Sequence, residues 1–160
     1  MKDKTFHYTN PEMVKYLLSK TPYSGSVLDA GSGKNKVWFN ELKGKKYECE
    51  IDDGVDFFEK ENGNYWGARV DWIVGNPPYH ESWKFTERAL QLADKGIAWL
   101  LNNQALNSHF TPRRLQRMSE LGFHYSKIVV VADKRWFGRY YYLILEKKEN
   151  NFISWNKKIY

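Results

Sequence analysis

The sequence predicts an α/β fold, and three of its features support that class. Short apolar runs of strand length, such as residues 26–30 and 97–101, alternate along the chain with segments of helical periodicity. Glycines and prolines separate these segments, as they do at turns between strands and helices. The last two apolar runs, residues 125–132 and 140–146, are joined by a short polar loop, which is typical of an antiparallel hairpin.

The composition is that of one globular domain of 160 residues, 42% of them hydrophobic. Cys49 is the only cysteine, which excludes an internal disulfide and a cysteine-based zinc cluster and fits a reducing, cytoplasmic setting. No apolar run is long enough to cross a bilayer, and the first residues show no apolar segment of a signal peptide. We therefore expect a cytoplasmic protein without a metal cofactor or a membrane partner.

The net charge of +6 is concentrated in the second half of the chain. Residues 1–80 carry 11 Lys and Arg against 12 Asp and Glu, whereas residues 81–160 carry 14 against seven. A solvated basic surface alone would account for such an excess. Because aromatic side chains are interleaved with the cations, the second half also predicts a surface that faces a polyanion such as nucleic acid.

The chain opens with a loop that leads into a helix within residues 5–20. Thr9 or Asn10 is a suitable N-cap, Pro11 suits the first helical position, and Glu12 favours the positive end of the helix dipole. The apolar residues of this segment recur at helical spacing, which predicts that one face of the helix packs on the core.

A strand predicted at residues 26–30 carries Asp29 and runs into a turn that contains Gly31 and Gly33. Glycines at a strand-to-helix turn let a ligand approach the backbone closely. The turn is not the dinucleotide-binding fingerprint, because Lys36 occupies the position of the third glycine. Strand, carboxylate and turn together predict a cofactor-binding loop.

A second strand is predicted at residues 47–52, and it ends in Asp52, 23 residues after Asp29. A carboxylate at this distance, at the tip of the second strand of a βαβ unit, typically accepts hydrogen bonds from ribose hydroxyls. A plain turn-forming role for Asp52 is the alternative. Asp56 and Phe57 follow and could supply an acceptor and an apolar plate for an adenine ring, although adjacent phenylalanines are more often core residues.

The stretch of residues 71–79, Asp-Trp-Ile-Val-Gly-Asn-Pro-Pro-Tyr, passes from a buried strand to two prolines. Pro77 and Pro78 lack backbone N–H groups, so the sheet must end there, and Asn76 is held extended by the proline that follows it. The strand end is therefore stiff and presents an amide, prolyl carbonyls and the ring of Tyr79. It would suit a planar, hydrogen-bonding ligand such as a nucleobase, whereas the alternative is a proline-terminated loop.

Beyond this stretch, helices are predicted at residues 83–92 and 111–122, with a buried strand at residues 97–101 between them. The second helix has Thr111 before Pro112 at its start and Gly122 at its end, and it carries several arginines that could contact a polyanion, among them Arg113 and Arg114.

The loop of the predicted hairpin sets Trp136 and Phe137 among cations that include Arg135 and Arg139. Aromatic rings between cations can stack on bases while the cations hold phosphates, although local packing of the rings is an equal alternative. Residues 152–155 are a candidate for one more edge strand.

In their order along the chain, these motifs resemble those of the S-adenosylmethionine-dependent amino-methyltransferases. The likeness is to the DNA N6-adenine methyltransferases with an Asn-Pro-Pro-Tyr motif, and it covers nearly the whole chain. The resemblance implies a Rossmann-like methyltransferase fold in a single domain, residues 1–160, with a doubly wound, mostly parallel sheet of seven strands and a C-terminal antiparallel hairpin. It also implies S-adenosylmethionine as the cofactor.

The resemblance carries three sets of site residues onto this sequence. The catalytic residues are Asn76, Pro77 and Tyr79. The cofactor-binding residues are Thr9, Asp29, Ala30, Gly31, Gly33, Asp52, Asp56, Phe57 and Asn76, of which Thr9 matches the family only loosely. For substrate binding, the resemblance points to Tyr79, and the basic helix and hairpin loop described above add Trp136, Phe137, Arg113, Arg114, Arg135 and Arg139.

The implied reaction is methylation of the exocyclic N6 amine of adenine in DNA after the base has been flipped out of the duplex. Three alternatives stay open: methylation of adenine in RNA, methylation of a glutamine side chain in a protein, and a non-catalytic nucleic-acid-binding module on the same fold. The chain departs from the family in lacking a segment long enough for target recognition. A separate specificity subunit is therefore a candidate partner.

Overall fold

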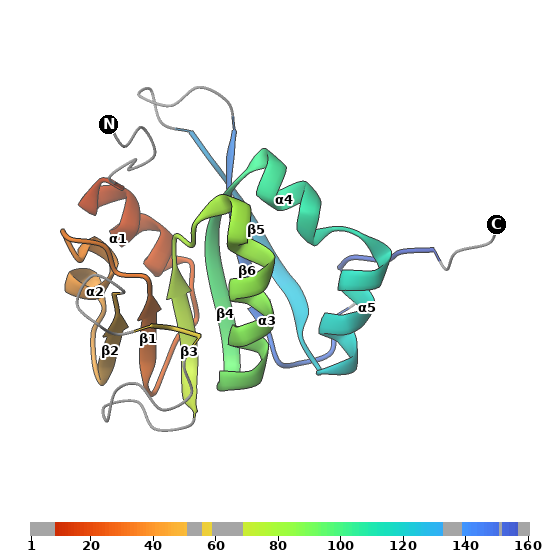
Figure 1. Ribbon diagram of the computed structural model, residues 1–160, viewed down its shortest axis with the longest axis horizontal. Coiled ribbons are helices and arrows are strands. Elements are labelled where there is room, and N and C mark those ends of the chain that lie inside the picture. Colours follow the sequence, from red (N-terminus) through yellow and green to blue (C-terminus); the bar gives the residue numbers. More distant parts are fainter. Residues whose placement is uncertain (1–8, 51–55, 59–68, 133–138, 151, 157–160) are drawn as a thin grey trace.

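The computed structural model describes residues 9–50, 56–58, 69–132, 139–150 and 152–156. Its strands are β1 (Val27–Ala30), β2 (Lys46–Cys49), β3 (Val70–Gly75), β4 (Ala93–Asn102), β5 (His124–Val131) and β6 (Tyr140–Glu146). Within the described residues they form one sheet in the order β2-β1-β3-β4-β6-β5 (Figure 1). The first four strands in this order are parallel, and β6 is antiparallel to both β4 and β5.

Helices cover both faces of this sheet (Figure 1). One face packs against α1 and α2, and the other against α3 and α5, while α4 follows β4 and a 3-10 helix, η2, joins β3 to α3. The bounds are α1 (Pro11–Ser19), α2 (Val37–Glu41), η2 (Tyr79–Glu81), α3 (Ser82–Leu92), α4 (Asn103–His109) and α5 (Pro112–Glu120). The α/β fold class, the mostly parallel sheet and the C-terminal hairpin are thereby confirmed.

Two predicted helix starts have the expected caps. The Asn10 side chain accepts a hydrogen bond from the Glu12 N–H at 2.8 Å, which makes Asn10 rather than Thr9 the N-cap of α1. Thr111 caps α5 in the same way by accepting from the Arg114 N–H, and a proline occupies the first position of each helix.

The alternation of side chains along β3 assigns its residues to the two layers of the core. Trp72 and Val74 pack in the layer under α1 and α2, whereas Ile73 packs in the layer under α3. Gly96 is the partner of Trp72 across the β3–β4 pair, and a Cβ at Gly96 would lie 2.3 Å from the indole ring. The glycine therefore makes the room that this large, 2%-exposed side chain occupies.

The structure corrects two strand predictions. The described residues form six strands, so a seventh strand is not confirmed. Residues 152–156 are not a strand, and the expected extra edge strand there is wrong. β2 ends at Cys49 and not at Asp52, since Glu50 is already outside the strand. The prediction that Asp52 terminates this strand is therefore wrong, and residues 51–55 lie outside the described part of the chain.

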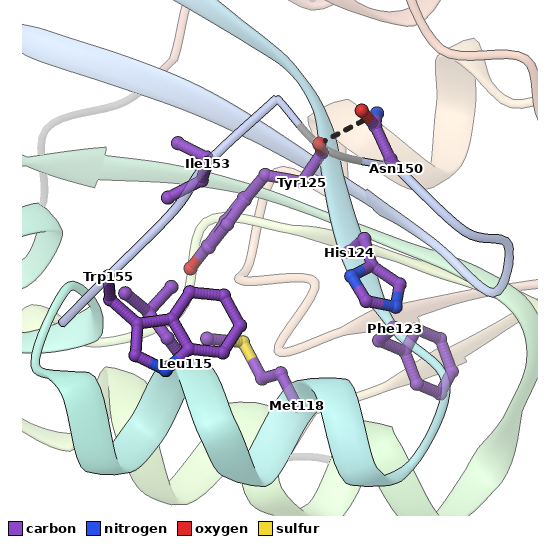
Figure 2. Close-up of a pocket in the computed structure, with 8 residues that line it drawn as sticks. All are labelled: Leu115, Met118, Phe123, His124, Tyr125, Asn150, Ile153 and Trp155. Atoms are coloured by element: carbon purple, nitrogen blue, oxygen red, sulfur yellow. Dashed lines mark hydrogen bonds between the residues drawn. The ribbon is translucent and has the colours of Figure 1, made fainter. Parts of the chain in front are cut away.

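The C-terminal tail packs beside α5 and β5 instead of adding a strand (Figure 2). The Asn150 side-chain amide donates a hydrogen bond to the Tyr125 carbonyl at 3.0 Å, and Ile153 and Trp155 pack against the core. Between the tail, α5 and β5 lies a cavity of about 10 Å³. This volume is enough for about one water molecule, so neither a nucleobase nor a cofactor fits there. None of the helices in the described residues is long and apolar enough to cross a membrane.

Candidate active site

The carboxyl ends of β1 and β3 lie side by side at one edge of the sheet. Asp29 in β1 is the register partner of Val74 in β3, so the turn after β1 lies next to the strand end that carries Asn76. The backbone at Gly75 has φ +148°, and a Cβ there would lie 3.1 Å from Asp29 Oδ1 and 3.3 Å from the Ala30 carbonyl oxygen. A side chain at residue 75 would thus push the two strand ends apart.

The glycine turn after β1 is held against the end of β2. The N–H groups of Gly31 and Ser32 donate to the Cys49 carbonyl at 2.9 and 2.8 Å. The N–H of Gly33 donates to the carboxylate of Glu50 at 2.6 Å. Gly31 and Gly33 have φ of +83° and +69°, values that favour glycine. The loop conformation is therefore allowed by its glycines and held by these hydrogen bonds.

The position of Glu50 was not predicted from the sequence. It is the first residue after β2, and its side chain reaches the cofactor-type glycine turn. This is where a ribose-binding carboxylate is expected in a βαβ unit, a role that the sequence assigned to Asp52. β2 pairs with β1 only from Lys46 to Cys49, opposite Val27 to Ala30, so the strand starts one residue earlier and ends three residues earlier than predicted.

Asp29 is completely buried beneath this turn. Its Oδ2 accepts a hydrogen bond from the Phe39 N–H at 3.1 Å, and its Oδ1 has no hydrogen-bond partner among the described residues. Burial raises the pKa of the Asp29 carboxyl to about 8, and the Phe39 N–H only partly opposes this. In the absence of a ligand, the carboxyl is therefore mostly protonated at neutral pH.

This pKa predicts that stability falls as the pH rises. The Asp29 carboxyl has a pKa of 3.8 in the unfolded chain and about 8 in the folded protein. At a pH between these values, the folded protein binds a proton that the unfolded chain has lost, so the free energy of unfolding decreases as the pH rises. Burial lowers the pKa of His109 from 6.5 to about 4, so this residue makes the free energy of unfolding increase with pH between those two values. The Asp29 effect is therefore best measured between pH 6.5 and 8, by urea unfolding.

Over that interval we expect the wild type to lose about 1–2 kcal/mol relative to Asp29→Asn, whose neutral amide has no proton to lose. Asp94→Asn, which alters an exposed carboxylate, is the control and should run parallel to the wild type. Parallel curves for the wild type and Asp29→Asn would show that Asp29 is already ionised in the folded protein.

The Asn76–Tyr79 strand end presents buried polar atoms. Asn76 Oδ1 and the Tyr79 hydroxyl are both buried and have no partner in hydrogen-bond geometry among the described residues, although the Asn76 side chain is near enough to the hydroxyl to act on the pKa of Tyr79. The Tyr79 ring packs against both core layers, and its centroid lies 6.2 Å from that of Tyr140 at the start of β6. Burial raises the pKa of Tyr79, so its hydroxyl stays neutral. Neighbouring His80 is exposed.

Unpartnered buried polar atoms are concentrated at this edge. Seven such side-chain atoms occur in the described residues, and four of them belong to the strand ends of β1 and β3: Asp29 Oδ1, Ser32 Oγ, Asn76 Oδ1 and the Tyr79 hydroxyl. Buried polar groups in proteins are normally hydrogen-bonded. Their concentration next to a glycine turn indicates that a polar ligand completes the site.

Other predicted cofactor residues lie around the glycine turn. Thr9 is buried and lines an open cleft of about 470 Å³ together with Asn35, which follows the turn. Phe57 is a core residue, as the alternative interpretation had it: it is 3% exposed and stacks on Phe85 at 5.2 Å. Phe85 in turn lies 3.9 Å from the Cβ position of Gly31. The Asp56 carboxylate accepts from the Phe58 N–H at 2.9 Å, which forms a local turn.

The predicted substrate-binding residues are dispersed. The Arg114 guanidinium lies 4.7 Å over the Trp83 ring and donates to the Ser108 carbonyl at 2.6 Å, so it holds α3, α4 and α5 together. Arg113 and Arg139 are exposed. Asp52, Arg135, Trp136 and Phe137 lie outside the described residues.

The described residues contain no group of three or more His, Cys, Asp or Glu side chains placed to hold a metal ion. The candidate site is therefore built from backbone amides, two carboxylates, an asparagine amide and aromatic rings.

No protein-family model matches the sequence, and no curated protein is significantly similar to it in sequence. Similarity appears among solved structures. The chain is similar to TrmK of M. capricolum in complex with S-adenosylhomocysteine, with a TM-score of 0.61, 11% identity, and 88% of this chain and 70% of that chain covered.

Two further structures agree. Precorrin-6y C5,15-methyltransferase of Geobacter metallireducens GS-15 gives a TM-score of 0.57 at 15% identity and covers 93% of each chain. Magnesium protoporphyrin IX methyltransferase of Synechocystis PCC 6803 with bound SAM gives a TM-score of 0.54 at 12% identity, with 86% of this chain and 77% of that chain covered. At such identities the likeness concerns architecture: this chain has the Rossmann-like α/β fold of these methyltransferases.

Proposed function

We propose that this protein transfers the methyl group of S-adenosylmethionine to the exocyclic N6 amine of adenine in DNA. The observation that carries the proposal is the buried, unpartnered Asn76 Oδ1, fixed between prolines and Gly75 directly beside a glycine turn of the cofactor-binding type. An acceptor in that position is suited to an amine with two N–H groups to donate.

The residues at the turn fit the proposed cofactor. Glu50 would accept hydrogen bonds from the ribose hydroxyls, and the Gly31–Gly33 turn with Asp29 beneath it would hold the amino-acid end. Thr9 borders the same region, and Asp56 with the Phe57–Phe85 stack would adjoin the adenine ring. When bound, S-adenosylmethionine would supply a methyl group activated by a positively charged sulfur.

The chemistry needs an acceptor pair because the amine of adenine is a poor nucleophile, with its lone pair delocalised into the ring. Asn76 Oδ1 and the Pro77 carbonyl would accept the two N–H groups and favour the pyramidal nitrogen of the transition state. Tyr79 would stack on the base and align the nitrogen with the methyl group. Transfer would leave S-adenosylhomocysteine as the second product, and the proton displaced from the amine would pass to solvent.

The choice of DNA rests on the basic second half of the chain. Arg139 is exposed directly before β6, at the carboxyl edge, and Arg113 is exposed in the first turn of α5; both could hold phosphates. Lys95, Lys147 and Lys148 lie at the opposite edge of the sheet, since β4 begins and β6 ends there, and we assign them no such role. Trp136 and Phe137 remain candidates to brace a flipped base.

The test is transfer of a labelled methyl group to DNA, to RNA and to total protein at low salt, followed by digestion and identification of the modified unit. N6-methyladenine from DNA is the expected product. N6-methyladenine from RNA alone, or methylglutamine from protein, would replace the proposal with one of those substrates. Calorimetric titration with S-adenosylhomocysteine is the accompanying measurement, and no binding together with no transfer would indicate a non-catalytic binding module.

A further inference from the structure

α4, a helix that the sequence did not predict, adjoins the candidate active site. It begins at Asn103, directly after β4, and β4 pairs with β3 just before the strand end that carries Asn76. α4 also packs against η2, which begins at Tyr79, so it lies at the edge of the sheet where β1 and β3 end (Figure 1). Any polymer that delivers a base to Asn76 must pass close to this helix.

The inner side of α4 is fixed to the rest of the protein. His109 is completely buried, bonds the Ala105 carbonyl through Nδ1 at 2.8 Å and contacts the Thr86 hydroxyl through Nε2 at 2.7 Å. Asn102 caps the helix by accepting from the Ala105 N–H at 2.9 Å. Arg114 holds the other end through the Ser108 carbonyl. A side chain on the outer face therefore projects from a rigid support, as a recognition residue should.

The outer face of α4 carries three exposed amides, Asn103, Gln104 and Asn107. Asn103 and Asn107 are one helical turn apart, with Gln104 beside them. Within the described residues, none of the three side chains makes a hydrogen bond. The helix has no Lys or Arg, in contrast to α5, where Arg113 and Arg117 are exposed.

This division of residue types matches two different tasks at a DNA surface. Lys and Arg bind phosphates and position the duplex without reading it, whereas Asn and Gln can donate to and accept from the edge of one adenine at the same time. A polar helix face that is merely solvated is the alternative. It does not explain why three amides, and no charged side chain, occupy the exposed face of a helix that packs against η2 at this edge of the sheet.

We propose that Asn103, Gln104 and Asn107 of α4 contact the bases that flank the target adenine and set the sequence context in which this protein methylates DNA. The inference rests on the proposed function. On this proposal, sequence preference comes from α4 of this chain itself, and α4 also packs against the η2 helix that carries Tyr79.

The experiment uses a pool of DNA duplexes with one adenine flanked by randomised bases, and measures the methylation rate for each context. The wild type should discriminate between its best and worst contexts by about fivefold or more, which is the smaller end of what one paired amide–base contact supplies. Combined replacement, Asn103→Ala, Gln104→Ala and Asn107→Ala, should bring that ratio close to one while leaving transfer detectable. Gln116→Ala, an exposed amide on α5, is the matched control and should keep the wild-type profile.

A second variant distinguishes base reading from a structural role. Gln104→Glu keeps the size of the side chain but replaces donor and acceptor by acceptors alone, so its preferred contexts should shift towards cytosine, which offers an amino donor. Wild-type transfer without context preference, or a profile unchanged in both variants, would overturn the inference and leave the proposed function standing. Transfer to RNA but not DNA would overturn the choice of DNA, and transfer to neither would overturn both proposals.

Discussion

Replacing Asn76 with alanine should lower the rate of methyl transfer by about 100- to 1,000-fold. The variant removes the acceptor that the proposed transition state uses, and the loss of one such preorganised group typically has an effect of this size. Asn76 follows β3 and is only half-buried, so the fold should tolerate the change. Steady-state transfer of labelled methyl to DNA measures the rate, and thermal unfolding measures the fold.

Two further variants sharpen this experiment. Asn76→Asp places acceptor oxygens at the same position and should retain more activity than Asn76→Ala. Gln116→Ala, which alters an amide on the outer face of α5, should transfer methyl at the wild-type rate. If Asn76→Ala remains within a few-fold of the wild type, Asn76 does not bind the reacting amine and the proposed mechanism is wrong.

Replacing Glu50 with glutamine should weaken S-adenosylhomocysteine binding about tenfold or more. Hydrogen bonds to a charged partner contribute about 1.5–3 kcal/mol, and the amide would keep only the weaker neutral interactions. Glutamine can still accept from the Gly33 N–H, so the turn should stay in place. Isothermal titration calorimetry measures the dissociation constant directly.

The matched comparison is Asp52→Asn, which tests the residue that the sequence pattern favours for the same role. The position of Glu50 at the end of β2 predicts little change in affinity for Asp52→Asn. A large loss in Asp52→Asn with normal binding by Glu50→Gln would restore the sequence-based assignment. Equal losses would mean that both carboxylates contact the ribose.

The sequence predicted most elements because each has a strong local signal. Asn10 and Pro11, and later Thr111 and Pro112, mark helix starts that the structure confirms. The apolar strands and the closing hairpin also lie where their patterns placed them, apart from shifted ends. α4 was missed because its seven residues, Asn-Gln-Ala-Leu-Asn-Ser-His, have weak helical periodicity and no proline at the start. α4 is held in place by tertiary contacts instead: His109 bonds the Thr86 hydroxyl, and Arg114 donates to the Ser108 carbonyl.

In the candidate site, too, some features were predictable from the local sequence and others depend on tertiary contacts. Asn76, Pro77, Tyr79 and the glycine turn were visible in the sequence because prolines fix the backbone locally and glycines allow the positive φ that a tight turn needs. The role of Arg114 could not be predicted, because its partners, Trp83 and the Ser108 carbonyl, come from other helices. The burial of Asp29, and hence its raised pKa, depends on α2, which packs over it, and on β3, which pairs beside it in the sheet.

By itself, the sequence determined the α/β class, the turn after Asp29 and the stiff Asn76–Tyr79 strand end, since these follow from local backbone restrictions and hydrophobic periodicity. Only the tertiary structure decided that β2 stops at Cys49, that the Glu50 carboxylate meets the glycine turn, and that α4 forms after β4 and packs against η2. The physical reason is that strand register and helix packing are set by contacts between residues far apart in the chain, which no local pattern specifies.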